Sequence, residues 1–414
     1  MMPRILLVTD RYFGEASGAW AARAAARAWQ DVGAQVDVFA EAHDARPQDQ
    51  MPGVRIYARR PYSGIHHLRG GAPLAEFREV LDDARPTHVF LFGNSNTKPV
   101  SFFRECRRRR IPRIAWYWCQ EFFCNGHYGC LPQGPCTRCI SNLGFSSVLY
   151  GCGYNAHQRP SARNLLTGMV VRRLLKPEQL ACEVLMGGSL SQLDLYRRFG
   201  VPEGRLIQCP LFYPRERTPA EPPSKGDYFV CSAYPRKDKG YHLIGPVMSH
   251  CSKSKLVISI AKAADAHDTV SRFGLAGLVG KGTVEIVSGQ TWTSGLARLV
   301  ARARGALIPS VWPTTTEYTL LEALSLAKPV VAFNLGVHAD AIRHGTNGLL
   351  SPVADVGGMA ANLDAVTDDD ELYDRLSAGA SRLFDSLTLS TSFRGPLARA
   401  LDVADQQVRL RVAG

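Results

Sequence analysis

Two groups of polar side chains in the second half of the chain have the types and spacing to bind a phosphorylated ligand. Arg236 and Lys239 belong to the turn Arg-Lys-Asp-Lys-Gly, and a diphosphate needs both cations and a closely approaching backbone. The second group is the run Thr-Thr-Thr-Glu at residues 314–317, which matches the capping-box pattern. This run predicts a helix that begins near Thr315, and the unpaired N–H groups of a helix start attract phosphate.

Glu322 is a further candidate because of the residues around it. It lies in the mostly apolar run Leu-Leu-Glu-Ala-Leu-Ser, and an ionised carboxylate is seldom buried in such a run without a partner. One interpretation places Glu322 on the solvated stripe of an amphipathic helix. The other makes it a carboxylate that receives the hydroxyl groups of a ligand.

The elements that must position these residues alternate between strand and helix. Residues 308–350 read as strand end, loop, helix, strand, loop, helix and turn, with Pro309 closing the first strand and Pro329 preceding the second. The N-terminal segment has the same order, with a strand at 4–9, an Ala-rich helix at 19–32 and a strand at 35–40. Further strands are expected at 54–58, 88–93, 114–118, 182–188, 228–232, 256–260 and 284–287. The pattern predicts an α/β fold with parallel sheets.

Residues 308–350 resemble the donor-binding signature of the group 1 (family 4-type) retaining glycosyltransferases. The matching residues are Pro309-Ser310, Glu322-Ala323, Lys328-Pro329-Val330-Val331 and the turn Gly-Thr-Asn-Gly-Leu-Leu at 345–350. The resemblance implies the GT-B fold, in which two doubly wound Rossmann-like domains face each other across a cleft. It also implies that Glu322 holds the ribose hydroxyls of a nucleotide.

The chain departs from this signature at three positions. Thr314 stands where the family has the first Glu of its pair, Val337 replaces a glycine, and Asp340 replaces a later Glu. In the family the first Glu contacts the transferred sugar, so nucleotide binding is better supported than the identity of the sugar. Glu317 lies three positions late and is either a substitute or a capping residue, of which capping is the simpler account.

The resemblance implies a set of site residues in both halves of the chain. Arg236 and Lys239 are the catalytic candidates, since in the family an Arg and a Lys clamp the departing diphosphate. The donor-binding candidates are Gly18, Thr314, Thr315, Thr316, Glu317, Tyr318 and Glu322. The acceptor-side candidates are Asn94, Ser95, Asn96 and Glu121, of which the first three are equally well explained as turn formers.

A cysteine cluster interrupts the first half. Cys124, Cys130, Cys136 and Cys139 place four thiols within sixteen residues, and a C-x2-C pair with two further thiols suits tetrahedral zinc. Structural zinc, unmetallated cysteines and, less readily, an iron–sulfur cluster all remain open. Some members of the resembled family carry a Cys-containing insert here after a His-Asp-aromatic motif, whose His this chain lacks. No cofactor is expected to be required for catalysis.

Length and composition agree with two domains. A chain of 414 residues exceeds one ordinary core, so we expect a first domain at 1–212 with a Cys-rich insert at 119–157. The nucleotide-sugar domain is expected at 213–390, and a C-terminal helix at 391–414 that returns to the first domain. No apolar run is long enough to span a membrane and no signal peptide is recognisable, so we expect a cytoplasmic protein.

Basic residues exceed acidic ones, 49 Lys and Arg against 37 Asp and Glu, which gives a formal net charge of +12. Such a charge attracts nucleotide donors or an anionic membrane, so peripheral contact with the inner membrane face is one reading. The four arginines at 107–110 are more simply explained as cations at a helix C-terminus. A nucleic-acid partner is not favoured, because no interleaved aromatic and basic motif accompanies the charge.

The function expected from the sequence is hexosyl-type transfer from a nucleotide-sugar to an acceptor hydroxyl, with retention implied only by the resemblance. The acceptor would be a glycan, a lipid-linked molecule or a small molecule, in polysaccharide, glycoconjugate or glycosylated-metabolite biosynthesis. The alternative is a degenerate, non-catalytic member that binds nucleotide or glycan. Thr314 in place of Glu and the missing His favour that alternative.

Overall fold

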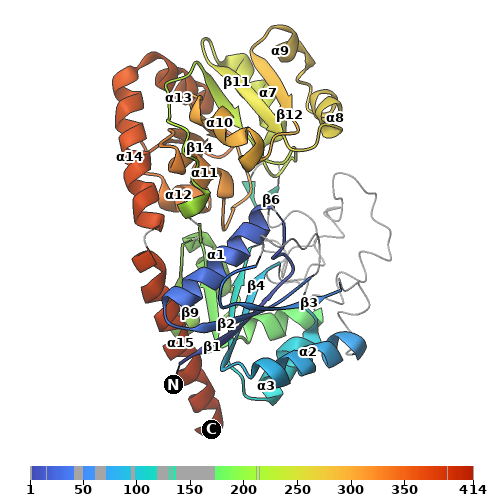
Figure 1. Ribbon diagram of the computed structural model, residues 1–414. Helices are drawn as coiled ribbons and strands as arrows, with labels where there is room; N and C mark the ends of the chain where they lie inside the picture. The colour runs from blue at the N-terminus through green and yellow to red at the C-terminus, as the bar shows by residue number, and fades with distance from the viewer. Residues whose placement is uncertain are drawn as a thin grey trace. The chain divides into compact units, whose positions relative to one another are not determined.

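The computed structural model describes residues 2–14, 16–41, 50–60, 71–94, 98–118, 130–131, 134–136, 173–210, 212–213, 215–388 and 390–413. The chain divides into two compact units (Figure 1). The first unit comprises Met1–Gly129, Thr137–Pro214 and Thr388–Gly414, and the second comprises Cys130–Cys136 and Arg215–Leu387. The C-terminal segment therefore belongs to the first unit, and the chain enters the main part of the second unit at Arg215.

The first unit is built on a seven-stranded sheet in the order β3-β2-β1-β4-β5-β8-β9, with all neighbours parallel. The strands are β1 Arg4–Thr9, β2 Gln35–Glu41, β3 Arg55–Arg59, β4 His88–Gly93, β5 Arg113–Tyr117, β8 Val184–Gly187 and β9 Leu206–Gln208. The helices are α1 Ser17–Asp31, α2 Gly71–Ala84, α3 Val100–Arg108, α6 Leu190–Arg198 and α15 Ser390–Ala413. The doubly wound order agrees with the prediction.

Apolar runs explain why these segments are central strands. Ile5, Leu6, Leu7 and Val8 of β1 are all buried, as strands covered on both faces must be. Helix α1 is Ala-rich where it packs, which lets it lie close to the sheet and to α15. Between α2 and α3 the rings of Phe77 and Phe102 stack with centroids 4.1 Å apart. Phe77 and Phe102 belong to one buried cluster with Leu6 and Val8 of β1.

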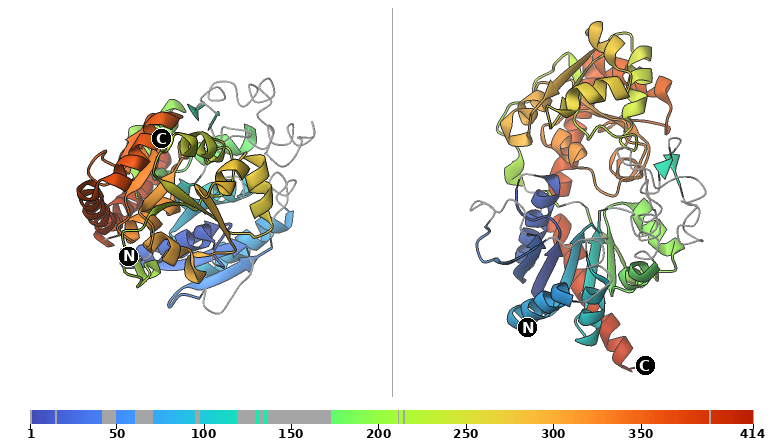
Figure 2. Two further views of the ribbon diagram at one scale, coloured as in Figure 1. Left: turned by 90° about the horizontal axis from the view of Figure 1, so that it is seen from above. Right: turned by 90° about the vertical axis from the view of Figure 1, so that its right-hand side faces the viewer.

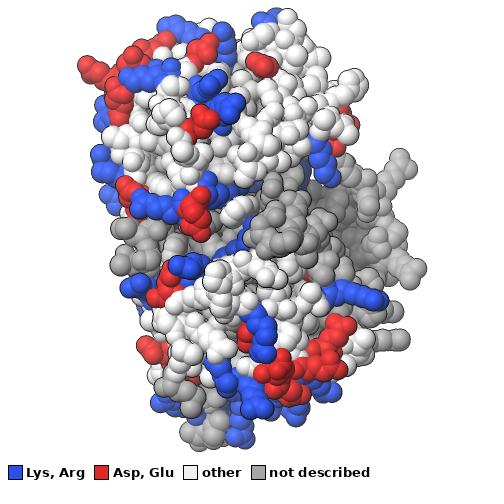
Figure 3. All heavy atoms as spheres, viewed as in Figure 1, with Lys and Arg blue, Asp and Glu red and all other residues white. Residues whose placement is uncertain are grey.

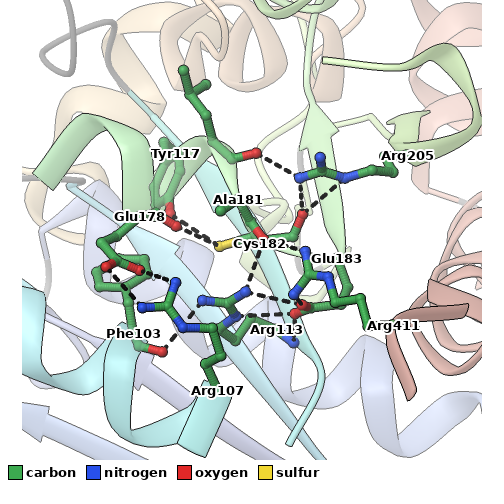
Figure 4. Close-up of polar contacts among 11 residues, drawn as sticks. Phe103, Arg107, Arg113, Tyr117, Glu178, Ala181, Cys182, Glu183, Arg205 and Arg411 are labelled. Carbon is green, nitrogen blue, oxygen red and sulfur yellow. Dashed lines mark hydrogen bonds and ion pairs between the residues drawn. The ribbon is translucent and has the colours of Figure 1, made fainter. Parts of the chain in front are cut away.

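Helix α15 is held to the first unit by a buried ion pair. Arg113 of β5 donates to Glu183 at 2.9 Å, and both side chains are almost fully buried (Figure 4). Arg411 of α15 also donates to Glu183 and to the carbonyl of Ala181. Arg411 therefore links α15 to a buried carboxylate that Arg113 already neutralises.

Three of the four arginines at 107–110 are paired with carboxylates. Arg107 binds Glu178 and Arg108 binds Glu105, while Arg109 bonds to Glu105 as well. The surface in Figure 3 shows basic and acidic residues interspersed over the visible face. The explanation of the run as structural cations therefore agrees with the contacts.

Among the described residues no helix is long and apolar enough to cross a membrane.

The second unit, coloured from yellow-green to orange-red in Figure 2, contains a six-stranded parallel sheet in the order β12-β11-β10-β13-β14-β15. The strands are β10 Tyr228–Cys231, β11 Lys255–Ile260, β12 Val284–Ser288, β13 Gly305–Ile308, β14 Val330–Phe333 and β15 Leu349–Ser351. The helices are α7 Tyr241–His250, α8 Asp265–Arg272, α9 Ala276–Gly280, α10 Leu296–Ala301, α11 Tyr318–Ser325, α12 Val337–Ala341, α13 Val356–Asp368 and α14 Asp370–Thr388. The hairpin of β6 (Cys130–Leu131) and β7 (Gly134–Pro135) also belongs to this unit.

The segment 215–225, rich in proline and charged residues, is fixed along the second unit. The indole N–H of Trp292 donates to the carbonyl of Arg217 at 2.9 Å, and Arg298 binds Glu221. Further on, the Ser224 amide donates to Ala301, and the Lys328 ammonium donates to the Ser224 carbonyl at 2.6 Å. Residues 215–225 therefore form part of the second unit's structure.

Candidate functional site

Three loops meet at the carboxyl ends of the central strands of the second sheet, where parallel α/β sheets bind ligands. The carbonyl of Asp238, in the loop after β10, accepts from the amides of Val311 and Trp312 after β13 at 3.1 and 3.2 Å. Gly240 lies in the left-handed region with φ +76°, and a Cβ there would lie 1.8 Å from the carbonyl oxygen of Pro309. The glycine of the Lys-Gly pair is thus required by a close backbone approach.

The loop after β14 is joined to the loop after β13 in the same way. The amide of Val337 donates to the carbonyl of Thr314 at 2.9 Å. Gly336 has φ +56°, and a Cβ there would come within 2.5 Å of that carbonyl oxygen. Thr314 is fully buried, and its hydroxyl donates to the Thr316 carbonyl at 2.5 Å. The loops after β10, β13 and β14 therefore form one continuous backbone framework.

The predicted capping box is wrong. Helix α11 begins at Tyr318, with Glu317 as its N-cap and no side-chain capping bond. Thr315 is buried and Thr316 is half-buried, and both lie in the loop before the helix. The hydroxyl of Thr314 is used inside its own loop, so it does not satisfy the helix amides. The predicted capping pattern does not form, because Thr314 binds within its loop and the Glu317 carboxylate binds Lys239.

The partner of Glu317 is Lys239. The Lys239 ammonium lies 2.8 Å from the Glu317 carboxylate, with 14% and 7% of the two side chains exposed. The same ammonium lies 4.8 Å from the centre of the Trp312 ring, a cation–π distance. A pair this dry is stronger than a surface salt bridge, because water screens it poorly. Any diphosphate that binds Lys239 must compete with Glu317.

Arg236 is paired within its own turn. Its Nε and Nη2 donate to the two oxygens of Asp238 at 2.8 and 2.9 Å, a bidentate arrangement, and 41% of its side chain is exposed. The turn thus presents a guanidinium oriented by Asp238 at the same edge as Lys239. Both sequence-predicted cations lie in one loop, each already bound to a carboxylate.

His338 of α12 is a buried residue that no sequence motif marks. Its side chain is fully buried, and neither ring nitrogen makes a well-formed hydrogen bond. Burial lowers its pKa to about 4, an effect that Glu317 opposes and Lys239 reinforces. The ring is therefore neutral at pH 7. Its signal in the sequence was absent, because a lone His in a loop is more often structural than functional.

Glu322 is buried in α11 and has a cation beside it. Nη2 of Arg217 donates to its Oε1 at 2.6 Å, with 4% and 10% of the two side chains exposed. Burial raises the pKa of Glu322 to about 7, Arg217 lowers it, and the like charge of Glu317 raises it further. The interpretation of Glu322 as a residue on a solvated stripe is wrong. Sequence reasoning missed Arg217, which lies in a Pro-rich run without a motif.

Five predicted residues belong to the first unit, and the structure describes two of them, Gly18 and Asn94. A Cβ on Gly18 would come within 2.6 Å of the Trp118 ring, so close packing of α1 explains this glycine. Asn94 follows β4, and its amide and side-chain N–H groups donate to Asp10 at 3.1 and 2.7 Å. Ser95, Asn96 and Glu121 lie outside the described residues. The roles of all five toward a ligand stay predictions.

Most of the cysteine cluster also lies outside the described residues. Cys124 and Cys139 belong to undescribed segments, and Cys130 lies in β6 with no description of its side chain. Cys136 is half-buried. Across the part of the chain that is described, no group of three or more His, Cys, Asp or Glu could hold a metal ion. The zinc prediction therefore stays untested.

Comparison with known proteins decides what the second unit is. Residues 232–369 match the family described as "Glycosyl transferases group 1". The matched part of the second unit is similar to the group 1 glycosyltransferases. The match begins directly after β10 and contains all three loops of the framework, together with Glu322, Lys239 and His338. The framework thus lies inside the matched segment.

Solved structures similar over the whole chain extend this finding to the fold. Alr3699/HepE of Anabaena in complex with UDP and glucose has a TM-score of 0.66 at 13% identity, over 97% of this chain and 99% of that one. Sucrose-phosphate synthase of Thermosynechococcus elongatus has a TM-score of 0.64 at 15% identity, over 100% of both chains. A glycosyltransferase of Rickettsia africae has a TM-score of 0.67 at 12% identity, over 97% and 98%. At such identities the likeness shows the two-domain Rossmann-like GT-B fold alone, as predicted. No curated protein sequence gives a significant match.

Proposed function

We propose that this protein transfers a sugar from a nucleotide-diphosphate donor to an acceptor hydroxyl. The observation that carries the proposal is the framework of loops after β10, β13 and β14 inside the glycosyltransferase domain, which gathers Arg236, Lys239 and Glu322 at one sheet edge. Glu322 would bind the ribose hydroxyls, and the two cations would bind the diphosphate. Structures similar to this chain were solved with UDP or UDP-glucose, so UDP is the first nucleotide to test.

The chemistry asked of these residues is stabilisation of a leaving group. As the bond from the sugar to the diphosphate breaks, negative charge gathers on the diphosphate and positive charge on the sugar carbon. Arg236, Lys239 and the positive end of the α11 helix dipole would stabilise the departing diphosphate. Asp238 and Glu317 hold the two cations, so donor binding exchanges one set of anionic partners for another.

The finer features of the function rest on the sequence resemblance. Transfer of a hexose with retention of configuration, in polysaccharide, glycoconjugate or glycosylated-metabolite biosynthesis, is proposed on that ground. So are a cytoplasmic location, peripheral contact with an anionic membrane, and catalysis without a required cofactor.

A second candidate function, nucleotide or glycan binding without catalysis, is favoured by one observation. Thr314 takes the place of a sugar-contacting carboxylate, and it is fully buried with its hydroxyl bound to Thr316. Glu317 supplies a carboxylate nearby, but it is bound to Lys239. A site that lacks a free carboxylate for the sugar could still hold a nucleotide.

Incubation with UDP-, GDP-, ADP- and TDP-sugars separates the two functions. The purified protein is expected to hydrolyse one donor slowly in the absence of acceptor, and to release nucleoside diphosphate faster when its acceptor is supplied. Donor binding in calorimetry without any release of diphosphate, across a panel of glycan and lipid acceptors, would support the binding-only function. Absence of binding to all four nucleotides would overturn both.

A further inference from the structure

We infer that Arg217 is a positioning residue for the donor site: it holds Glu322 by one carboxylate oxygen so that the other can receive a nucleotide's hydroxyl groups. The inference rests on the proposed function, because it takes Glu322 as the ribose-binding carboxylate. Arg217 lies outside the matched glycosyltransferase segment, 15 residues before its first residue and 105 residues before Glu322 in the chain.

The geometry of the pair favours a one-sided grip. Nη2 of Arg217 donates to Oε1 of Glu322 at 2.6 Å, and among the described residues no hydrogen bond reaches Oε2. About a tenth of the Glu322 side chain remains exposed, whereas Arg217 is almost fully buried. An arginine that served only to neutralise the carboxylate could use both oxygens, as Arg236 does with Asp238. Here one oxygen is bound by the protein and the other is left for a ligand.

Arg217 is itself held tightly, which a positioning residue must be. Its guanidinium carbon lies 5.6 Å from the centre of the Trp292 ring and 5.1 Å from that of Tyr318, both cation–π distances. The indole N–H of Trp292 also donates to the Arg217 carbonyl at 2.9 Å. Tyr318 is the first residue of α11, the helix that carries Glu322, so the arginine and its carboxylate share one support.

Arg217 also lies at a particular place in the chain, at the start of the second unit's main segment. It ends the short helical turn Arg215–Arg217, which is the point where the chain enters the second unit from the first. The following residues are fixed along the second unit through Glu221 and Ser224. The donor carboxylate is therefore bound by the segment of chain that joins the two units.

The charges around Glu322 predict how the loss of Arg217 would appear. Burial and Glu317 disfavour the ionised carboxylate, Arg217 favours it, and Lys239 partly offsets Glu317 by binding it. Without Arg217 only the disfavouring influences act directly on Glu322, so its pKa must rise above its value of about 7. A protonated Glu322 binds hydroxyls more weakly. The loss of nucleotide affinity in the variant should therefore be large at neutral pH and small in alkali.

The experiment is calorimetric titration of UDP into the full-length protein at pH 6.5, 7.5 and 8.5. Arg217→Gln and Arg217→Met both remove the charge, and Met keeps most of the side chain's length between the two rings. Arg217→Lys keeps the charge. The matched control is Arg215→Gln, because Arg215 lies in the same turn and pairs on the surface with Asp385. The titrations of the control variant also show any change of affinity with pH that comes from UDP itself. Circular dichroism checks the fold of each variant.

The neutral variants are expected to lose about tenfold in UDP affinity at pH 7.5, relative to the control, and to come within about threefold of it at pH 8.5. Arg217→Lys should restore most of the affinity at pH 7.5. A loss that is equal at all three pH values, with no rescue by Lys, would show a merely structural role. Folded neutral variants that bind like the control at every pH would overturn the inference outright.

Failure of the proposed function gives a different result. If wild-type protein binds none of UDP, GDP, ADP and TDP, both proposals fall. If folded Glu322→Gln binds as wild type does, Glu322 is not a nucleotide-binding residue and the positioning role falls, whereas the proposal of sugar transfer stands. If Glu322→Gln weakens binding and the Arg217 variants do not, only the positioning role is lost.

Discussion

Lys239 and Glu317 form a buried ion pair 2.8 Å long that joins the loop after β10 to the residue before α11. The two residues are 78 positions apart in the chain, and the sequence predicted another role for each side chain. Lys239 was expected to face a diphosphate and Glu317 to cap a helix. Their contact makes Glu317 a competitor of the ligand, and this competition can be measured.

Glu317→Gln is expected to raise UDP affinity by about 1 kcal/mol, because a charge-assisted bond that competes with the diphosphate becomes a neutral one. Calorimetry tests this. An unchanged or lower UDP affinity in Glu317→Gln would show that the carboxylate contacts the donor itself.

Lys239→Ala should lower turnover more than donor affinity if the charge acts chiefly as the diphosphate leaves. Calorimetry and initial rates on this variant test the prediction.

Glu322→Gln should weaken nucleotide binding by about 1–3 kcal/mol, the cost of losing hydrogen bonds to a charged acceptor. The fold should persist, because the amide is the same size and can still accept a bond from Arg217. Wild-type affinity should also rise with pH between about 6 and 8, as a carboxyl with a pKa of about 7 ionises. The Gln variant should show a flatter profile, and a profile parallel to the wild type's would refute the assignment.

His338 should make the protein sensitive to acid. Its pKa is about 4 when buried and 6.5 when unperturbed, so the unfolded chain binds the extra proton first as the pH falls. Stability from the neutral ring is therefore complete above pH 6.5 and is lost progressively toward pH 4, by at most about 3 kcal/mol.

Thermal unfolding of wild type and His338→Leu at pH 7 and pH 4.5 isolates this effect. The midpoint should fall further for wild type than for the variant between the two pH values, whatever the other groups contribute to both. An equal decrease of the midpoint in the two proteins would mean that the protonated His338 ring finds a hydrogen-bond acceptor in the folded protein.

Gly240→Ala should destabilise the second unit by more than about 2 kcal/mol, because the new Cβ would meet a backbone oxygen and the left-handed conformation disfavours alanine. The movement of the loop should also weaken UDP binding. Gly277→Ala is the matched control, since a Cβ there meets nothing within 4 Å. Similar melting temperatures for the two variants would contradict the close approach to Pro309.

The cysteine cluster predicts metal content. If Cys124, Cys130, Cys136 and Cys139 hold one structural zinc, purified protein should contain about one zinc per chain, and chelation should leave UDP binding intact. Elemental analysis with thiol alkylation under anaerobic conditions checks this. Four free thiols and no metal would leave unmetallated cysteines as the better reading.

The sequence by itself determined the fold class and pointed to the segment that matches the group 1 glycosyltransferases, because both depend on local patterns. Buried parallel strands require continuous apolar runs such as Ile5 to Val8, and the glycines and prolines of residues 308–350 mark turns that few other residues permit. These constraints act over a few residues, so they can be read without knowledge of the partners.

Only the tertiary structure decided which charges meet. Glu322 pairs with Arg217, which lies 105 residues away in the chain. Glu317 pairs with Lys239, although the local pattern predicted that it would cap a helix. A capping bond is worth about 1 kcal/mol and forms with any free amide nearby, whereas a buried carboxylate without a cation costs several. Pairing the buried carboxylate therefore outweighs forming the cap. Which cation is within reach depends on which loops the sheet order of the second unit brings together.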